Sequence, residues 1–356
     1  MKKKVWIVSW YGIQAGGLER IVRILNQVLS DYYNVEIIDI PYICRYKGWK
    51  WLMRFESRLV RMFVFSAFIK RIAKKEDFII THGQNAPFVK SDFLFDHGSI
   101  MSLKREMDQF IYGGSSLFEY AAVKNAKMNV AVSDWTKNQI IDNYHIDEER
   151  IVVLKNCVET DIFFPCERIE TDRTAILFCG RLEDAKGLFM LQQLAEYVES
   201  SKDYELKIAA NDNQNAELFM GRNNITIQCG VAFEEMNGFY NKGNVLFVPS
   251  RCEGFGMGII ESLSAGVPVV ANEVGIVRNL VENGCPAIQV IDKEEELPGI
   301  LDKIQKSAGR YYTMEERLLI HEYVEKNYGM DCYRAQLLRL MKGEADAKGQ
   351  HCYPDL

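Results

Sequence analysis

The chain has 356 residues, a length that suits two domains of ordinary size rather than one core. Hydrophobic residues make up 48% of the chain and charged residues 26%, which is typical of a folded globular protein and excludes a disordered one. The formal net charge of −6 excludes a general nucleic-acid-binding protein, because no domain-wide excess of cations is present to displace counterions.

The cysteines and the N-terminal residues indicate the cellular compartment of the protein. The nine cysteines are scattered singly without a C-x-x-C pair, so we expect a reducing, cytoplasmic location and neither a disulfide framework nor a zinc site. Lys2–Lys4 and the apolar run after them imitate a signal peptide, but the run is short and a helical pattern follows, which favours a buried first strand. No apolar run reaches the roughly 18 residues that a membrane-spanning helix needs.

Short apolar runs alternate with helical patterns along the front half of the chain. Residues 17–29 have apolar side chains at helical spacing. The runs expected to form strands are 5–10, 34–40, 77–82, 92–97, 128–134 and 150–156. This alternation predicts a parallel sheet covered by helices.

The segment 156–173 breaks this rhythm with Pro165 and a polar tail, and we expect a linker at 161–173. A second alternation follows, with expected strands at 175–180, 206–211, 224–230, 245–250, 268–273 and 287–292. The pattern predicts an α/β protein with one domain at 1–160 and a second at 174–325. A last amphipathic pattern spans 314–341, and the tail 343–356 is expected to be flexible.

A glycine-rich segment comes directly after the expected strand 245–250, at the end where open α/β sheets bind ligands. Its residues before the expected helix are Gly254, Phe255, Gly256, Met257 and Gly258. Free N–H groups and the positive end of a helix dipole at such a turn suit a phosphate or a diphosphate. The sequence therefore predicts a phosphate-binding turn here.

Two carboxylates flank this turn, Glu253 before it and Glu261 close to the start of the helix. Beside a diphosphate they would repel it, so we expect them to accept hydrogen bonds from neutral sugar hydroxyls. The alternative is that Glu261 only favours the helix dipole and Glu253 is solvated.

Arg181 and Lys186 follow the expected strand 175–180. They are the cations that a leaving diphosphate requires when no metal supplies positive charge, although they can also be an ordinary surface pair. No D-x-D sequence occurs, which disfavours an enzyme that holds a diphosphate through a metal ion, and we expect no metal site.

Two histidines, His82 and His97, each end an expected strand of the front domain and precede a glycine. A lone histidine is more often structural than functional. Two at equivalent strand ends are candidates for a site, because those ends face the ligand in open α/β sheets.

These residues resemble a known family. Glu253 and Glu261, with A-G-V-P-V-V-A after them, resemble the E-x7-E signature of retaining glycosyltransferase family 4. Its members have the GT-B fold, in which two Rossmann-like domains with parallel sheets face each other across a cleft. Weaker matches to family motifs, in chain order, lie at 16–20, 131–137, 156–165 and 179–188, and the resemblance covers residues 4 to 342.

The resemblance implies roles for the donor-site residues. Arg181 and Lys186 would hold the diphosphate of a nucleotide-sugar, and Glu261 would hold the ribose hydroxyls. Glu253 and His97, which fits the family's histidine better than His82 does, would contact the donor sugar.

Further roles follow for the two domains. Gly16 and Gly17 match the family's glycine-rich first loop. The first domain would bind the acceptor, the second the donor, and the helix at 326–342 would return to the first domain. The implied reaction is metal-independent, retaining transfer of a hexose from a UDP-sugar to a hydroxyl of a glycan or lipid-linked acceptor, as in bacterial surface polysaccharide synthesis. No cofactor besides the donor is implied.

The segment 45–75 carries ten Lys or Arg and one acid, with aromatic residues between them. We expect Lys50, Arg54, Arg58 and Arg61 to share one helical face, which can lie on an anionic membrane surface. The protein would then be peripheral on the inner face of the membrane. A solvated helix packed on the domain is the alternative.

Other functions are the alternatives. A GT-B phosphorylase or a nucleotide-sugar epimerase would share the fold and the phosphate site. A non-catalytic partner subunit would keep the fold, but the intact candidate site disfavours it. A dinucleotide site at Gly16 and Gly17 is disfavoured because G-x-G-x-x-G is missing.

Overall fold

The structure is a computed structural model that describes residues 2–13, 17–55, 57–99, 115–167, 172–293, 295–311 and 313–344. The chain divides into two compact units. The first contains the chain up to Lys155 and the end of the C-terminal helix from Gln336 onward, and the second runs from Asn156 to Ala335.

The first unit is built on a six-stranded sheet with strand order β2-β1-β3-β4-β5-β6, in which all neighbours are parallel. Its strands are β1 (Lys4–Val8), β2 (Asn34–Ile38), β3 (Phe78–His82), β4 (Phe93–Asp96), β5 (Met128–Ala131) and β6 (Ile151–Val153). All six expected strands of the front half are therefore confirmed.

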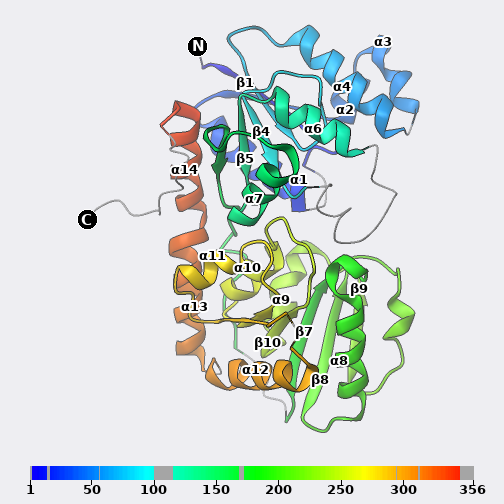
Figure 1. Cartoon of the computed structure of the whole chain (residues 1–356), viewed down its shortest axis with the longest axis vertical. Coiled ribbons are helices and arrows are strands. Elements are labelled where there is room, and N and C mark those ends of the chain that lie inside the picture. The colour runs from blue at the N-terminus through cyan, green and yellow to red at the C-terminus, as the bar shows by residue number, and fades with distance from the viewer. Residues whose placement is uncertain are drawn as a thin grey trace. The chain divides into compact units, whose positions relative to one another are not determined.

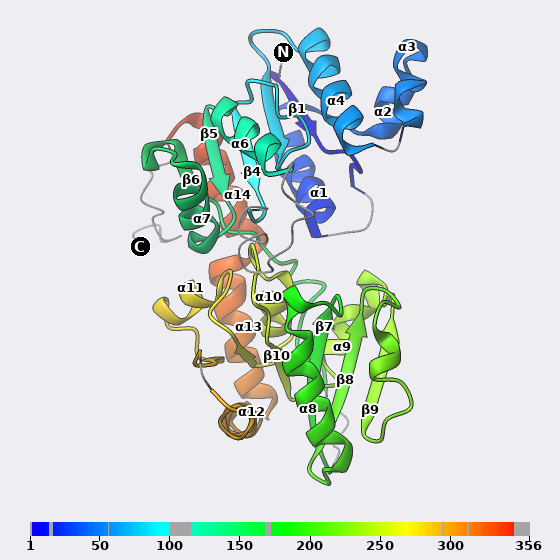
Figure 2. The ribbon, with the colours of Figure 1, turned by 45° about the vertical axis from the view of Figure 1, so that its right-hand side comes forward.

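The helices of this unit are α1 (Gly17–Ser30), α2 (Ile40–Cys44), α3 (Lys47–Lys50), η1 (Leu52–Arg54), α4 (Arg58–Ile72), α6 (Ser115–Asn125), α7 (Asp134–Tyr144) and η3 (Glu148–Arg150). Helix α1 buries its apolar face, including Ile21, Leu25 and Val28. Within the unit, α2, α3 and α4 form one group beside β1, as both ribbon views show (Figures 1 and 2).

The second unit contains another six-stranded parallel sheet, with strand order β12-β11-β10-β7-β8-β9. Its strands are β7 (Thr174–Gly180), β8 (Tyr204–Ala210), β9 (Ile225–Cys229), β10 (Val245–Val248), β11 (Val269–Ala271) and β12 (Ile288–Val290). The central strands are buried on both faces, which explains why they read as continuous apolar runs in the sequence. The expectation of a second parallel sheet is confirmed.

The remaining helices follow β7 in the chain, and the last of them, α14, ends in the first unit. They are η4 (Asp184–Lys186), α8 (Leu188–Ser200), η5 (Ala216–Leu218), η6 (Phe233–Glu235), α9 (Met236–Tyr240), α10 (Met257–Ser264), α11 (Val277–Glu282), α12 (Leu297–Arg310), α13 (Met314–Tyr328) and α14 (Met330–Lys342). Helix α8 packs on β8 and β9, whereas α12 packs on β7, β10 and β11 (Figure 1). Leu191, Leu194 and Val198 of α8 join the buried side chains of the strands in one core.

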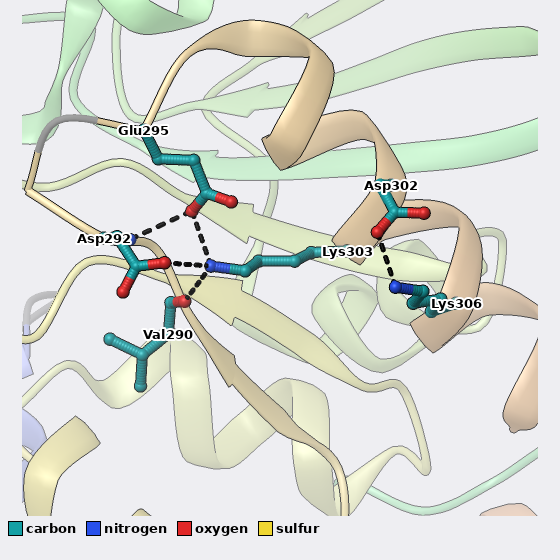
Figure 3. Close-up of polar contacts among 6 residues, drawn as sticks. All are labelled: Val290, Asp292, Glu295, Asp302, Lys303 and Lys306. Carbon is teal, nitrogen blue, oxygen red and sulfur yellow. Dashed lines mark hydrogen bonds and ion pairs between the residues drawn. The ribbon is translucent and has the colours of Figure 1, made fainter.

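A partly buried lysine, Lys303, connects the edge strand β12 to helix α12. The Lys303 ammonium donates hydrogen bonds to the Val290 carbonyl at 2.7 Å, to Asp292 at 2.9 Å and to Glu295 at 2.5 Å (Figure 3). These partners lie at and just after the carboxyl end of β12. The edge strand is therefore held by side-chain contacts as well as by its single strand partner.

Helix α13 caps the C-terminal end of α10 through a buried arginine. The Arg317 guanidinium donates to the carbonyls of Gly266 at 3.2 Å, Ala265 at 2.9 Å and Cys166 at 2.5 Å, and to the side-chain oxygen of Asn241. Burial lowers its pKa to about 10, so it keeps its charge at neutral pH. A cation at this helix end also complements the negative end of the helix dipole.

Three expectations need correction. The pattern 314–341 is not one helix, because α13 ends at Tyr328, Gly329 is extended and α14 starts at Met330. The returning helix therefore starts at Met330 rather than at residue 326. Seven of the described cysteines are free thiols, but Cys332 is disulfide-bonded, which differs from the reducing environment that we expected. Most of the expected flexible tail 343–356 lies outside the described residues.

Candidate functional site

Polar side chains follow the carboxyl ends of three neighbouring strands in the second unit, β7, β10 and β11. Lys186 lies in the 3-10 turn after β7, and Glu253 lies in the loop after β10. Asn272, directly after β11, donates to the carbonyls of Pro249 at 2.9 Å and Ser250 at 3.1 Å. These contacts fix the loop after β10 against its neighbour. The three loops thus form one polar edge of the sheet.

Lys186 and Glu253 are joined at this edge. The Lys186 Nζ lies 2.6 Å from the Glu253 Oε1, and the Ser250 hydroxyl donates to the same oxygen at 2.9 Å. Both partners are largely buried, with side-chain exposures of 21% for Lys186 and 13% for Glu253. An ion pair shielded from solvent in this way is stronger than one on an open surface.

A glycine makes this close approach possible. Gly187 follows Lys186 with a φ of +78°, a conformation that favours glycine. A Cβ atom at this position would lie 2.1 Å from the Pro249 carbonyl oxygen, which no packing adjustment can accommodate. The backbone N–H of Arg251 also donates to the Ala185 carbonyl at 2.9 Å. The turn after β7 and the loop after β10 are therefore in direct backbone contact.

Arg181 lies at the same strand end but makes a different contact. Its Nη2 lies 3.0 Å from the Glu183 Oε1, and its side chain is 58% exposed. A Cβ atom at Gly180 would lie 3.9 Å from the Lys186 Cδ, so the backbone before Arg181 runs beside the Lys186 side chain. The exposed guanidinium remains accessible to a ligand that also reaches Lys186.

The glycine-rich turn enters helix α10. Gly256 occupies the N-cap position with a φ of +93°, so α10 begins at Met257. Phe255 is 4% exposed, and its carbonyl accepts the N–H of Ile276 at 2.9 Å, which anchors the turn from below. The first backbone N–H groups of a helix have no partner within the helix. Together with the dipole they make this turn suited to an anion.

Glu261 lies in the second turn of α10, close to the start of the helix. The carboxylate is 9% exposed, and its Oε2 accepts a hydrogen bond from the Tyr240 hydroxyl at 2.8 Å. That hydroxyl lies 3.4 Å from the Cys179 Sγ. A carboxylate, a phenol and a thiol thus form one buried chain beneath the glycine-rich turn.

Gly258 lies directly against this buried row of hydrogen-bonding groups. A Cβ atom there would lie 2.8 Å from the Cys179 Sγ and 3.4 Å from the Tyr240 hydroxyl, so a side chain would displace both. Burial raises the pKa of the Cys179 thiol to about 12 and raises the pKa of Tyr240 further above its usual value. Both groups therefore keep their protons at neutral pH and serve as hydrogen-bond donors.

In the first unit, the two candidate histidines meet. His82 ends β3 and His97 follows β4, its neighbour in the sheet. The His82 Nδ1 lies 2.9 Å from the His97 Nε2. Desolvation lowers the pKa of His97 to about 4, and burial together with His97 lowers the pKa of His82 well below its usual value. Both rings are neutral at physiological pH.

The glycine-rich first loop is only partly described. Gly17 is the first residue of α1, and a Cβ atom added to it would meet no atom within 4 Å. Gly16 lies outside the described residues. The candidate role of both glycines therefore stays a prediction.

Comparisons with known proteins show the family of the chain. The family described as "Glycosyl transferases group 1" matches residues 173–306, and "Glycosyltransferase Family 4" matches residues 16–162. The chain belongs to these glycosyltransferases. An uncharacterized glycosyltransferase of Methanocaldococcus jannaschii is 25% identical over 276 residues, covering 72% of this chain and 70% of that protein. The O-antigen chain mannosyltransferase RfbU of Salmonella typhimurium is 24% identical over 225 residues, covering 53% and 57%.

Solved structures establish the fold of this glycosyltransferase as GT-B. Sucrose-phosphate synthase from Thermosynechococcus elongatus superimposes with a TM-score of 0.76 at 16% identity, covering 96% of this chain and 99% of that one. WaaG, a glycosyltransferase involved in lipopolysaccharide biosynthesis, gives a TM-score of 0.71 at 15% identity, covering 95% and 100%. HepE of Anabaena in complex with UDP-glucose gives 0.64 at 14% identity, covering 96% and 99%.

The segment 45–75 of this glycosyltransferase is not one amphipathic helix. It is divided among α3, η1 and α4, so the four expected cations do not share one helical face. Arg61 is partly buried, and its Nη1 donates to the Tyr11 hydroxyl at 3.0 Å. Lys50, Arg54 and Arg58 are exposed. Large apolar side chains are exposed beside them: Trp51 at 56%, Phe55 at 52%, Leu59 at 50% and Phe63 at 56%.

Among the described residues, no cluster of histidine, cysteine, aspartate or glutamate is arranged to hold a metal ion. Of the helices in the described part of the chain, none is both long enough and apolar enough to cross a bilayer.

Two residues of the site, Tyr240 and Cys179, were not predicted from the sequence. Cys179 directly precedes Gly180 and Arg181, so its position at the end of β7 was readable. Its contact with Tyr240 was not, because the two residues are 61 positions apart and Tyr240 has no motif around it.

Proposed function

We propose that this glycosyltransferase transfers a hexose from UDP-hexose to a hydroxyl of a glycan or lipid-linked acceptor, with retention of configuration and without a metal ion. The observation that carries the proposal is the contact between Lys186 and Glu253 beside the N-terminus of α10. The cation and the helix N–H groups suit a diphosphate, and the carboxylate suits the hydroxyls of a sugar.

The charged and polar groups of the site have different roles in the proposed reaction. Lys186, the accessible Arg181 and the N-terminus of α10 stabilise the negative charge that develops on the leaving diphosphate. Glu261 holds the ribose hydroxyls, Glu253 holds the donor sugar, and His97 donates a hydrogen bond to a sugar hydroxyl. The acceptor hydroxyl attacks the face that the diphosphate leaves, and the departing diphosphate takes its proton. The second unit binds the donor and the first binds the acceptor.

The choice of uridine rests on the relatives. HepE of Anabaena, a structural neighbour, has been solved in complex with UDP-glucose, and an O-antigen chain mannosyltransferase is among the sequence relatives. Thermal shift with UDP, GDP and ADP, followed by NMR of the product formed from the preferred sugar donor, tests the proposal. We expect UDP to stabilise most and the product to keep the donor's anomeric configuration. Inversion would contradict retention.

A GT-B phosphorylase or an epimerase remains the alternative. Incubating labelled UDP-hexose with the protein but without an acceptor separates these reactions. A transferase leaves the sugar unchanged apart from slow hydrolysis. An epimerase converts the sugar on the nucleotide, and a phosphorylase releases sugar phosphate when phosphate is added.

We also propose that the first unit binds an anionic membrane surface, where a lipid-linked acceptor would lie and where a cytoplasmic, peripheral enzyme would meet it. Trp51 and Phe55, on either side of η1, and Leu59 and Phe63 of α4 are exposed and adjoin three exposed cations in the chain, while the chain as a whole has a net charge of −6. Aromatic side chains favour the interface, and each nearby cation contributes about 1 kcal/mol of attraction.

Vesicle sedimentation tests the membrane proposal. Wild type should sediment with vesicles that contain phosphatidylglycerol at low salt and dissociate at high salt. Changing Trp51, Phe55 and Phe63 to serine should abolish binding, whereas Phe189→Ser, a control in the second unit at a side chain that is 71% exposed, should not. Absence of wild-type binding at low salt would contradict the proposal.

A further inference from the structure

The hydrogen bond between His82 and His97 has a direction that the surroundings determine. The two rings lie within 15° of parallel, and their centroids are 5.2 Å apart. With His82 Nδ1 only 2.9 Å from His97 Nε2, the rings meet along their edges. One nitrogen must donate and the other must accept, because both rings are neutral.

The other nitrogen of His82 decides between the two directions. His82 is 1% exposed, and its Nε2 is buried without a hydrogen-bond partner among the described residues. Phe95 packs against the His82 ring, with 5.4 Å between the two ring centroids. If His97 donated, His82 would carry its proton on Nε2, and an N–H group would be buried unpaired. Buried N–H groups without partners are rarer than buried acceptors without partners, so His82 carries its proton on Nδ1 and donates to His97.

This direction fixes the chemistry of His97. Its Nε2 accepts, so its proton must be on Nδ1. His97 is partly exposed, and its Nδ1 is not among the buried unpaired atoms of the described chain. The histidine therefore presents a neutral N–H group as a hydrogen-bond donor rather than a lone pair.

We infer that His82 is a positioning residue that holds His97 in the tautomer with its proton on Nδ1, so that His97 donates a hydrogen bond to a hydroxyl of the sugar substrate. The inference rests on the proposed function, in which His97 contacts the donor sugar. His82 itself touches no substrate. It acts only through His97, as a partner that orients a functional imidazole.

NMR of protein labelled with ¹⁵N-histidine tests the tautomer without any substrate. The chain has five histidines, and the signals of His97 are assigned by their loss in His97→Gln. We expect a protonated Nδ1 and an unprotonated Nε2 in His97. A proton on the His97 Nε2 would overturn the inference, whatever reaction the protein catalyses.

Two substitutions of His82 test its effect on turnover. His82→Asn places an amide N–H near the position of Nδ1 and should keep kcat within about threefold of wild type. His82→Phe keeps the ring volume but removes the donor, and it should lower kcat about 10- to 100-fold, the range for lost partners of functional histidines. Affinity for UDP and the melting temperature should stay unchanged in both variants.

The double variant His82→Phe/His97→Phe separates positioning from a structural role. It should be no slower than His97→Phe alone, because His82 has no effect once His97 is absent. Independent, multiplying losses would overturn the inference, as would equal losses in His82→Asn and His82→Phe. If no UDP-sugar is turned over by wild type, the proposed function fails, but the NMR measurement still decides the tautomer.

Discussion

The ammonium of Lys186 and the carboxylate of Glu253 lie 2.6 Å apart, although the residues are 67 positions apart in the chain. In this arrangement each group neutralises the other. A diphosphate that binds Lys186 must share it with Glu253, so the ion pair competes with the nucleotide in the free protein.

Glu253→Gln should therefore separate nucleotide affinity from turnover. Removing the negative charge releases Lys186 and removes repulsion of the diphosphate, so UDP should bind as tightly as to wild type or more tightly. Loss of the carboxylate at the donor sugar should lower kcat by roughly 10²-fold. Calorimetry with UDP and a transfer assay measure both. If UDP affinity falls instead, Glu253 belongs to the nucleotide site and its assignment to the sugar is wrong.

Tyr240→Phe should weaken UDP binding through Glu261. The substitution removes the 2.8 Å hydrogen bond that orients this carboxylate, a charge-assisted bond worth about 1.5–3 kcal/mol. We expect the loss to disappear when 2′,3′-dideoxy-UDP replaces UDP, because that nucleotide lacks the hydroxyls proposed to contact Glu261. Tyr197→Phe, at an exposed tyrosine of the same unit, is the control. Equal losses for both nucleotides would place Glu261 away from the ribose.

Arg317→Met should destabilise the second unit alone. It leaves three buried carbonyls and the Asn241 side chain without their donor, at a cost of roughly 3 kcal/mol or more. All five tryptophans (Trp6, Trp10, Trp49, Trp51 and Trp135) lie in the first unit. In urea unfolding, the far-UV circular dichroism transition should shift to lower urea while the tryptophan fluorescence transition stays in place. A shift of the fluorescence transition alone would refute this prediction.

Asp96→Asn should stabilise the first unit at neutral pH. Burial raises the pKa of Asp96 from 3.8 to about 6, against the hydrogen bond from the Gly98 N–H. Between these values the folded state binds more protons than the unfolded state, so this group's contribution to stability falls as pH rises through the window. Above pH 6 the variant should be more stable by an amount on the order of 2 kcal/mol.

The same variant should lose this advantage below about pH 4, where Asp96 is protonated in both states. Urea unfolding followed by tryptophan fluorescence at several pH values measures the effect. Asp142→Asn, at an exposed aspartate of α7, is the control for the substitution itself. An advantage of Asp96→Asn that is constant with pH would show that burial of its charge is not the cause.

The sheets were predictable because buried parallel strands leave continuous apolar runs, and all twelve expected strands are present. That Lys186 and Glu253 lie close together was predictable for a related reason, since both follow strands whose carboxyl ends share one edge of a sheet. The buried chain from Cys179 through Tyr240 to Glu261 was not, because it depends on packing between α9, α10 and β7 that leaves no local pattern. The break at Gly329 was hidden by apolar residues that keep helical spacing on both sides of it.

The prediction of one helical face in the segment 45–75 was wrong for a local reason. Its cations and aromatic residues suggested one continuous helical face, but the chain is interrupted after Lys50 and again before Arg58. The exposed apolar side chains of the segment became apparent only from the structure, since sequence spacing did not separate Phe63, which is 56% exposed, from Phe65, which is fully buried.

The most direct test of the donor site compares UDP with uridine by calorimetry in EDTA, using wild type and Lys186→Met. We predict that wild type binds UDP without metal and that Lys186→Met binds it about 10- to 100-fold more weakly, equivalent to about 1.5–3 kcal/mol, while uridine binds both equally. A metal requirement for UDP binding to wild type, or equal losses for UDP and uridine in Lys186→Met, would contradict the placement of the diphosphate at Lys186.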